Sequence, residues 1–240
     1  MSLSKPAPLT LLFAYGLCLI ILTVICDRCY RKKDKMKIAW LTDIHLDFPS
    51  PRTLVKFMRA LKLSPADVIV ISGDIASGPS VEHFLTKIGQ KTARTLYFVL
   101  GNHDFYGSSF KTVRERVRLL TLSQPGLVWL SEKGVISLTG TTALIGHEGW
   151  ADGRLGDYER SEVVLNDYLH IMEFQPSGFT GGTALRPKSE RLLIMQRLAD
   201  EAAAHFEKYL EEALQSHRAV LAITHVPPFE QASRYRGELC

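Results

Sequence analysis

Cysteine is scarce in this chain and is poorly placed for cross-linking. The 240-residue sequence has 4 cysteines, of which Cys18, Cys26 and Cys29 lie near the N-terminus and Cys240 is the last residue. The stretch from Met36 onward therefore offers no internal pair of thiols. This excludes a disulfide framework and a cysteine metal site as the basis of the globular part.

Excess charge and flexible linkers are also in short supply. The net charge is only +4, and part of it comes from one basic cluster between residues 28 and 35, so we expect no specific nucleic-acid binding. After residue 36 the chain has no Gly/Ser-rich or Pro-rich linker and no internal repeat. We therefore expect one domain over residues 36–240, preceded by an N-terminal segment over residues 1–35. The 46% of hydrophobic residues suffices for a sizeable core.

Four apolar runs each end on side chains that bind cations or move protons. Each run has the composition of a buried strand, and ligands of open α/β sheets collect at the carboxyl ends of strands. Carboxylates, amides and imidazoles bind divalent cations, and imidazole also transfers protons near neutral pH. The runs with their end residues are Ile38–Thr42 with Asp43 and His45, Val68–Ser72 with Gly73 and Asp74, Thr95–Leu100 with Gly101, Asn102, His103 and Asp104, and Ala219–Ile223 with His225.

Helical patterns separate these runs and predict an α/β fold. Apolar residues recur at helical spacing over residues 52–63, 81–93, 109–122 and 189–215. The middle of the chain differs, because short strands over 128–130, 135–138 and 143–145 resemble an antiparallel segment. The connection over residues 151–187 is rich in turn formers and is long enough to be a functional lid.

The ordered motifs resemble those of the calcineurin-like metallophosphoesterases. The pattern of that family is D-x-H, G-D, G-N-H-[DE], a lone His and G-H-x-H, each at a strand end, and the first four blocks occur here in order. The resemblance covers about residues 36–230. It implies a four-layer α/β/β/α sandwich.

The resemblance also implies a dinuclear metal centre that hydrolyses phosphoesters with a metal-activated water. Asp43 and His45 would hold one divalent ion, and Asn102 and His225 would hold the second. Asp74 would bridge the two. The mixture of oxygen and nitrogen donors favours Mn, Fe or Zn as the metal ions over Mg.

Three further side chains receive an interpretation from the sequence. His103 would protonate the leaving-group oxygen, as the resemblance implies. His147 lies outside the family motifs, and a structural or supporting role is favoured. Arg154 would reach a substrate phosphate as a charge-assisted donor, although an exposed loop arginine is the simpler interpretation.

The substrate expected from the resemblance is a phosphoester, either a small molecule or a nucleotide- or lipid-linked one. The protein serine/threonine phosphatases carry an Asp-Arg-Gly block shortly after G-D. Residues 75–78 read Ile-Ala-Ser-Gly instead, which disfavours that branch.

One family block is absent, because no G-H-x-H follows His225. In the family this block gives each metal one further ligand, so each metal would lack one protein ligand and the last strands of the fold would be missing. We therefore expect a C-terminally truncated domain with weak or no hydrolysis. The alternative function is a non-catalytic binding or scaffold module, or an inactive fragment, that keeps the fold.

The N-terminal segment is dominated by the apolar run from Leu9 to Cys26. At about 18 residues this run is just long enough to span a bilayer as a helix, and a basic cluster follows it. We expect a hydrophobic helix that anchors the protein in the membrane, with the catalytic domain in the cytoplasm. A cleaved signal peptide is disfavoured, because only Lys5 precedes the run and no small-x-small site follows it. The alternative is translation from Met36, which would give a soluble cytoplasmic domain.

Overall fold

The computed structural model describes residues 10–14, 17–25, 35–176, 184–235 and 238–239 of the chain. The strands of this part form sheets of six, three and two strands. Its α-helices are α1 (Pro51–Leu63), α2 (Val81–Thr92), α3 (Phe110–Ser123), α4 (Asn166–His170) and α5 (Lys188–Ser216).

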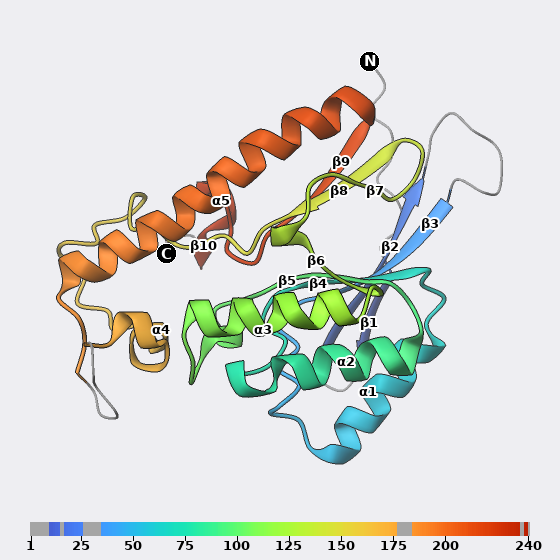
Figure 1. Cartoon of the computed structure of the whole chain (residues 1–240), viewed down its shortest axis with the longest axis horizontal. Helices are drawn as coiled ribbons and strands as arrows, with labels where there is room; N and C mark the ends of the chain where they lie inside the picture. The colour runs from blue at the N-terminus through green and yellow to red at the C-terminus, as the bar shows by residue number, and fades with distance from the viewer. Residues whose placement is uncertain (1–9, 15–16, 26–34, 177–183, 236–237, 240) are drawn as a thin grey trace.

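The largest sheet has the strand order β1-β2-β3-β4-β5-β6 (Figure 1). Strands β3 to β6 are parallel, and β1 and β2 continue the sheet antiparallel beyond β3. Along the chain, α1, α2 and α3 alternate with the parallel strands, so the expected α/β class is confirmed. The strands are β1 (Thr10–Ala14), β2 (Leu17–Ile25), β3 (Lys35–Leu41), β4 (Val68–Ser72), β5 (Leu96–Val99) and β6 (Leu127–Trp129).

A second sheet contains β7 (Ile136–Ser137), β8 (Thr142–Gly146) and β9 (Ala219–Ile223) in that order. Strand β8 pairs antiparallel with β7 and parallel with β9. A short antiparallel pair, β10 (Arg234–Tyr235) and β11 (Glu238–Leu239), follows near the end of the described chain.

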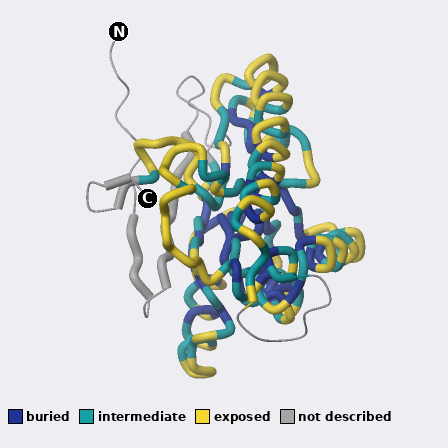
Figure 2. Tube along the Cα trace, turned by 90° about the vertical axis from the view of Figure 1, so that its left-hand side faces the viewer, coloured by how far each residue is buried: buried dark blue, intermediate teal, exposed yellow. Residues whose placement is uncertain are grey.

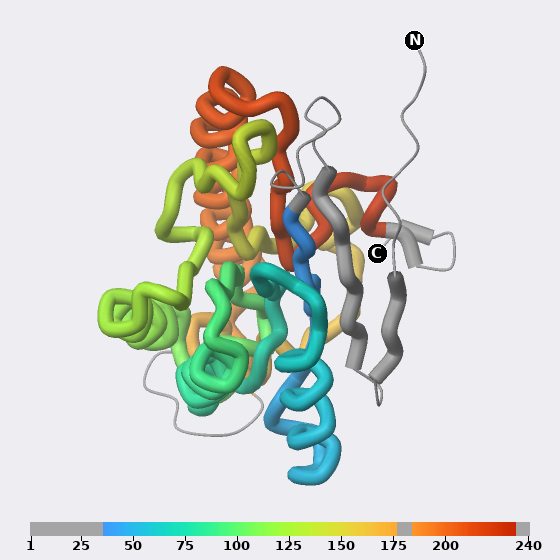
Figure 3. Tube along the Cα trace, turned by 90° about the vertical axis from the view of Figure 1, so that its right-hand side faces the viewer, coloured from blue at the N-terminus to red at the C-terminus, as the bar shows by residue number. Residues whose placement is uncertain are grey.

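The two larger sheets and the helices stack in four layers. Helices α1, α2 and α3 cover the outer face of the six-stranded sheet, and α5 covers the outer face of the three-stranded sheet (Figure 1). Figure 3 shows α5 and α1 on opposite sides of the molecule. Buried residues gather in the strands and on the inner faces of the helices, as Figure 2 shows.

Side-chain alternation along the strands builds three apolar cores between these layers. In β3, Ala39 and Leu41 pack towards α1 to α3, whereas Ile38 packs between the two sheets. In β8, Leu144 joins the core between the sheets and Ile145 packs towards α5. Successive side chains of a strand point to opposite faces, so each strand holds two layers together.

The described residues of the N-terminal apolar run form strands, so the expected hydrophobic helix over residues 9–26 is wrong there. Strand β2 pairs with β3 along the whole length of β3, from Leu19 opposite Leu41 to Ile25 opposite Lys35. Much of β2 is β-branched, which favours a strand, and the edge of β3 offers unpaired backbone groups. None of the helices in the described part of the chain combines the length and the apolarity that a bilayer-spanning helix requires.

The expected antiparallel segment in the middle of the chain is only partly correct. Strands β7 and β8 are antiparallel, but β6 pairs parallel with β5 at the edge of the large sheet. The three short apolar runs over residues 128–130, 135–138 and 143–145 have similar compositions. Composition does not tell whether a strand pairs parallel or antiparallel with its neighbour. The preceding helix α3 returns the chain to the start of the sheet and makes the parallel pairing possible.

Candidate metal centre

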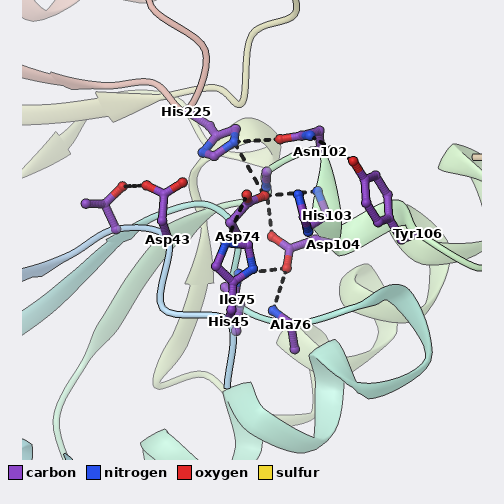
Figure 4. A network of polar contacts seen from close by, with 12 residues as sticks. Asp43, His45, Asp74, Ile75, Ala76, Asn102, His103, Asp104, Tyr106 and His225 are labelled. Atoms are coloured by element: carbon purple, nitrogen blue, oxygen red, sulfur yellow. Dashed lines mark hydrogen bonds and ion pairs between the residues drawn. The ribbon is translucent and has the colours of Figure 1, made fainter. Parts of the chain in front are cut away.

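The predicted site residues from four strand ends lie together in the structure. The loops after β3, β4, β5 and β9 carry them to one edge of the two sheets, where their side chains point towards one another (Figure 4). His45 Nε2 lies 3.6 Å from Asp74 Oδ2, and His225 Nε2 lies 3.4 Å from Asp74 Oδ1. The loops after β4 and β9, which are far apart in the sequence, thus meet at the carboxylate of Asp74.

Asp74 belongs to two clusters of potential metal ligands. One contains His45, Asp74 and His103, and the other contains Asp43, Asp74 and His225. Within each cluster the ligand atoms lie within 4.8 Å of one another. Asp74 is buried and is the member that both clusters share.

The backbone at these residues adopts an uncommon conformation. Asp43, His45 and Asp74 have φ angles of 50°, 37° and 53°, in the left-handed region that non-glycine residues seldom occupy. Such conformations concentrate at functional sites, where the surrounding structure holds them. Strand β3 ends at Leu41, so Asp43 and His45 are not brought together by strand alternation but by this left-handed turn.

Two glycines allow the strand ends to approach each other. A Cβ atom on Gly101 would overlap with Oδ1 and the backbone N of Asp74. A Cβ atom on Gly73 would overlap with the ring of His225, and Gly73 also has a φ of +94°. The glycines of the G-D and G-N-H-D motifs are therefore needed for the close packing of the ligands, in addition to any role in turning the chain.

The imidazole of His225 is oriented by the backbone. Its Nδ1 lies 2.8 Å from the carbonyl oxygen of Ser72, which only accepts, so Nδ1 carries a proton. Its Nε2 lies 2.9 Å from Oδ1 of Asn102 and 3.4 Å from Oδ1 of Asp74. The Nδ2 of Asn102 donates to Asp167, which fixes Oδ1 as the amide atom that faces His225. The lone pairs of His225 Nε2, Asn102 Oδ1 and Asp74 Oδ1 therefore face one another, an arrangement that suits a metal ion.

The donor set fits a divalent transition metal. Carboxylate and amide oxygens and imidazole nitrogens together suit Mn, Fe or Zn. The Nδ1 atom of His45 is buried and has no hydrogen-bond partner among the described residues. The atom of His45 that faces the shared carboxylate is its Nε2, 3.6 Å from Asp74 Oδ2, whereas His225 faces Asp74 Oδ1, so the two oxygens of Asp74 offer two separate positions for a cation.

His103 lies against the clusters through its backbone and its ring. Its backbone N–H donates to Asp74 Oδ1 at 2.9 Å. Its ring is stacked on Tyr106 at 4.2 Å between centroids and meets the ring of His45 edge-on at 4.6 Å. The imidazole is half-buried, so it is held in place and still reaches solvent.

Two buried carboxyl groups hold the loops in position. Asp104 accepts hydrogen bonds from the backbone N–H groups of Ile75, Ala76 and Gly101, at 2.8, 2.9 and 2.7 Å, and so ties the loop after β4 to the loop after β5. Burial raises the pKa of Asp104 well above its ordinary value, against the effect of these donors. Burial also raises the pKa of Asp74, although the imidazole of His225 opposes it.

A comparison with protein families identifies the chain. The family model described as calcineurin-like phosphoesterase matches residues 36–240. The chain belongs to this family.

Comparison with solved structures supports the same fold. The phosphopantetheinyl hydrolase of Mycobacterium tuberculosis is similar, with a TM-score of 0.51 and 14% sequence identity over 81% of this chain and 70% of that chain. At this identity the similarity concerns the fold alone. A comparison with curated proteins found no match.

Asp167 contacts the candidate site, and the sequence did not reveal it. Its Oδ1 accepts hydrogen bonds from Nδ2 of Asn102 at 2.7 Å and from the hydroxyl of Tyr106 at 2.6 Å. It therefore holds both a predicted metal ligand and the ring that supports His103. The only signal that pointed towards it was the length of the 151–187 connection, since Asp167 belongs to no family motif.

His147 and Arg154 lie outside the clusters. The Nδ1 of His147 accepts from Gly149 N at 3.2 Å, and its ring packs 5.2 Å from that of His205 on α5. Burial lowers the pKa of His147. Arg154 is exposed and pairs with Asp152 and Asp200 at 2.9 and 2.7 Å. These contacts are structural, in line with the simpler interpretation of both residues.

Glu148, the neighbour of His147, holds the loop that carries His225. Its backbone carbonyl accepts from the N–H groups of His225 and Val226, each at 3.1 Å. Its buried carboxylate pairs with Arg114 at 3.1 Å and accepts from the hydroxyl of Ser131. The loop that carries His225 therefore rests on a buried ion pair.

Proposed function

We propose that this chain hydrolyses phosphoesters with the help of two divalent cations held by the clusters around Asp74. The observation that carries the proposal is the convergence of lone pairs on both sides of that carboxylate, from His225 and Asn102 on one side and His45 on the other. Membership of the calcineurin-like phosphoesterase family supports this reaction.

The residues divide into ligands and a proton donor. Asp43, His45, Asn102 and His225 would hold the cations, and Asp74 would contact both. Divalent cations, when bound, polarise the phosphoryl oxygens and provide a nucleophilic water at neutral pH. Mn, Fe or Zn suits the mixed donor set best.

His103 supplies the proton for the leaving group in this proposal. Its half-buried ring is fixed by the stacking of Tyr106 and by the backbone bond to Asp74, so it presents a ring nitrogen at the edge of the site. A general acid in this position assists departure of an alkoxide or phenolate oxygen, typically by 10²- to 10⁴-fold. The side chain would then recover its proton from water.

A non-catalytic binding or scaffold module is the competing function. It would need the fold and the metal ligands but not His103. The stacking of the half-buried His103 ring on Tyr106 favours the enzyme, because a scaffold has no use for a fixed imidazole beside the ligands.

The test measures metal binding and hydrolysis separately. Isothermal titration with Mn²⁺ should show two equivalents bound to the wild-type chain and a loss of binding in Asp74→Asn, while the exposed Asp67→Asn serves as the matched control. Hydrolysis of bis(p-nitrophenyl) phosphate should require added Mn²⁺ and should be weak, because no G-H-x-H block follows His225 to give each metal its further ligand. His103→Gln should lower kcat by about 10²-fold or more and should reduce Mn²⁺ binding less than Asp74→Asn does, because His103 belongs to only one of the two clusters.

Two results would reject the proposal. One is equal Mn²⁺ binding by the wild type and Asp74→Asn, which would place the metal elsewhere. The other is metal binding without metal-dependent hydrolysis of this or any other phosphoester tested, which would leave the scaffold function.

A further inference from the structure

A large cavity lies beside the metal centre. Its volume is ≈ 1160 Å³, and it is bounded by residues 149–165, by helix α5 and by residues 224–233 after β9. A cavity of this size is slightly larger than the range of about 300–1,000 Å³ that is typical of small-molecule sites. Residues of the 151–187 connection form one wall of the cavity. The sequence predicted that this long connection has a function.

The walls of the cavity are largely apolar. Several large apolar side chains that line it are exposed to solvent, and helix α5 contributes the small side chains of Ala199, Ala202 and Ala203. An apolar ligand would cover these surfaces and remove them from water, which is favourable at about 25 cal/mol per Å². The exposed apolar residues are Leu155, Val163, Val164, Leu165 and Phe229.

Arg191 places one charge within this apolar surface. Its side chain lines the cavity, is only 8% exposed, and stacks over the ring of Tyr168 at 4.2 Å. Among the described residues no carboxylate pairs with it, and its buried Nε has no hydrogen-bond partner. A buried charge without a counter-ion is unfavourable, so this guanidinium is suited to bind an anionic group of a ligand.

The other cations that line the cavity already have partners. Arg154 pairs with Asp152 and Asp200. The Nζ of Lys188 donates to the backbone carbonyl oxygens of Glu159 and Ser161, each at 2.7 Å. Arg191 is therefore the cation of the cavity wall that has an unused binding capacity within the described residues.

Two stretches of the cavity lining are directly continuous in sequence with residues of the metal centre. Thr224 and Val226 line the cavity, and they flank the predicted metal ligand His225. Tyr168 lines it as well, and its neighbour Asp167 holds the amide of Asn102. A molecule with its phosphoryl group at the ligands would therefore have this cavity next to it.

We propose that the cavity binds one arm of the phosphoester substrate, an apolar chain that ends in an anionic group paired with Arg191. This rests on the proposed function for the position of the phosphoryl group, and it adds the class of substrate. The apolar walls select the chain, and the guanidinium selects the charged end.

Binding to the cavity is tested without metal, so that it does not depend on hydrolysis. Titration calorimetry in EDTA uses dodecanoate as the probe and 1-dodecanol as its uncharged counterpart, both at monomeric concentrations. Dodecanoate should bind at least about tenfold more tightly than dodecanol, since an ion pair to a buried group contributes on the order of one such factor. Arg191→Met keeps the apolar stem and should remove this difference.

Matched variants on α5 provide the controls. Ala203→Trp fills the cavity and should weaken both probes by tenfold or more, whereas Ala204→Trp is exposed outside the cavity lining and should have no effect. Arg197→Met removes an exposed arginine of the same helix and should also have no effect. Equal loss in Arg191→Met and Arg197→Met, or no loss in Ala203→Trp, would overturn the proposal.

Hydrolysis then connects the cavity to the metal centre. With Mn²⁺, the p-nitrophenyl phosphodiester of 12-hydroxydodecanoate should have a KM at least tenfold below that of methyl p-nitrophenyl phosphate, and Ala203→Trp should abolish the difference. Equal KM values with intact hydrolysis would overturn the cavity proposal and leave the proposed function standing. Dodecanoate binding in a chain that hydrolyses no phosphodiester would reject the proposed function, and with it the cavity as a substrate subsite.

Discussion

Asn102 and Asp167 are joined by a hydrogen bond of 2.7 Å between Nδ2 and Oδ1. The bond determines which end of the Asn102 amide faces His225, because the carboxylate accepts only from the nitrogen. Asp167 lies on α4, far in sequence from the G-N-H-D motif. The long connection between β8 and α5 thus takes part in forming the metal centre.

Loss of Asp167 should weaken metal binding without unfolding the protein. In Asp167→Ala the Asn102 amide is free to rotate, and removal of a group that orients a ligand typically lowers metal affinity 10- to 100-fold. Titration calorimetry with Mn²⁺ measures the change, and thermal unfolding in EDTA measures stability.

Two further variants separate positioning from a general structural effect. Asp167→Asn keeps an acceptor oxygen and should recover part of the affinity. Tyr106→Phe removes the hydroxyl but keeps the ring on His103, so it should leave Mn²⁺ affinity within about threefold of the wild type. A fall in affinity that follows the loss of thermal stability in all three variants would contradict the positioning role.

The sequence predicted that the site residues lie at strand ends, because each motif follows an apolar run. Parallel strands that alternate with helices bring their carboxyl ends to one edge, so Asp74 and Asn102 had to be near each other. His225 was assigned to the site from the family resemblance, and the structure brings it to the same edge, 2.9 Å from Asn102. The helix bounds were predicted to within about a residue for α1, α2, α3 and α5, since the apolar stripes are strong.

Other features depend on contacts that no local pattern carries. Asp167 reaches Asn102 only through the path of the 151–187 connection, and β6 joins β5 only because α3 brings it back. The N-terminal apolar run is apolar enough for either a membrane helix or a buried strand. In the structure its pairing with β3 decides in favour of the strand. The left-handed backbone at Asp43 likewise follows from the packing of the loops.

Gly101→Ala should disrupt the metal centre. The added methyl group would overlap with Asp74 Oδ1 and its backbone N, so the two loops must move apart. Overpacking of this kind costs about 1–3 kcal/mol, and Mn²⁺ affinity should fall with it. Gly126→Ala is the control, since its Cβ would meet nothing within 4 Å. Urea unfolding and Mn²⁺ titration that show the same values for both variants would refute this account of the glycine.

Arg114→Met should be among the most destabilising single changes in the described chain. It leaves the buried carboxylate of Glu148 without its ion-pair partner, a change that costs about 3–5 kcal/mol in comparable buried pairs. Arg118→Met is the matched control on the same helix, because its pairs with Glu132 and Glu115 are exposed and worth at most about 1 kcal/mol. Urea unfolding at neutral pH compares the two, and equal losses would mean that burial of Glu148 does not matter.

The stability of the protein should fall as the pH drops from about 6.5 towards 4, in part because of His205. Burial lowers the pKa of this imidazole from 6.5 to about 4, with a smaller contribution from the neighbouring His147. The unfolded chain therefore binds a proton in this pH range that the folded chain does not bind. Stability then rises with pH by at most about 1.4 kcal/mol per pH unit for this one group.

His205→Gln isolates this contribution from that of the carboxylates. The free energy of unfolding, measured with urea in EDTA at several pH values between 4 and 7, should depend less steeply on pH in His205→Gln than in the wild type. His83→Gln replaces an exposed histidine on α2 and should keep the wild-type slope. The ring centroid of His205 lies 5.2 Å from that of His147, so a charge on His205 should weaken the packing of α5 against the residues that follow β8. Parallel slopes in all three proteins would contradict this prediction.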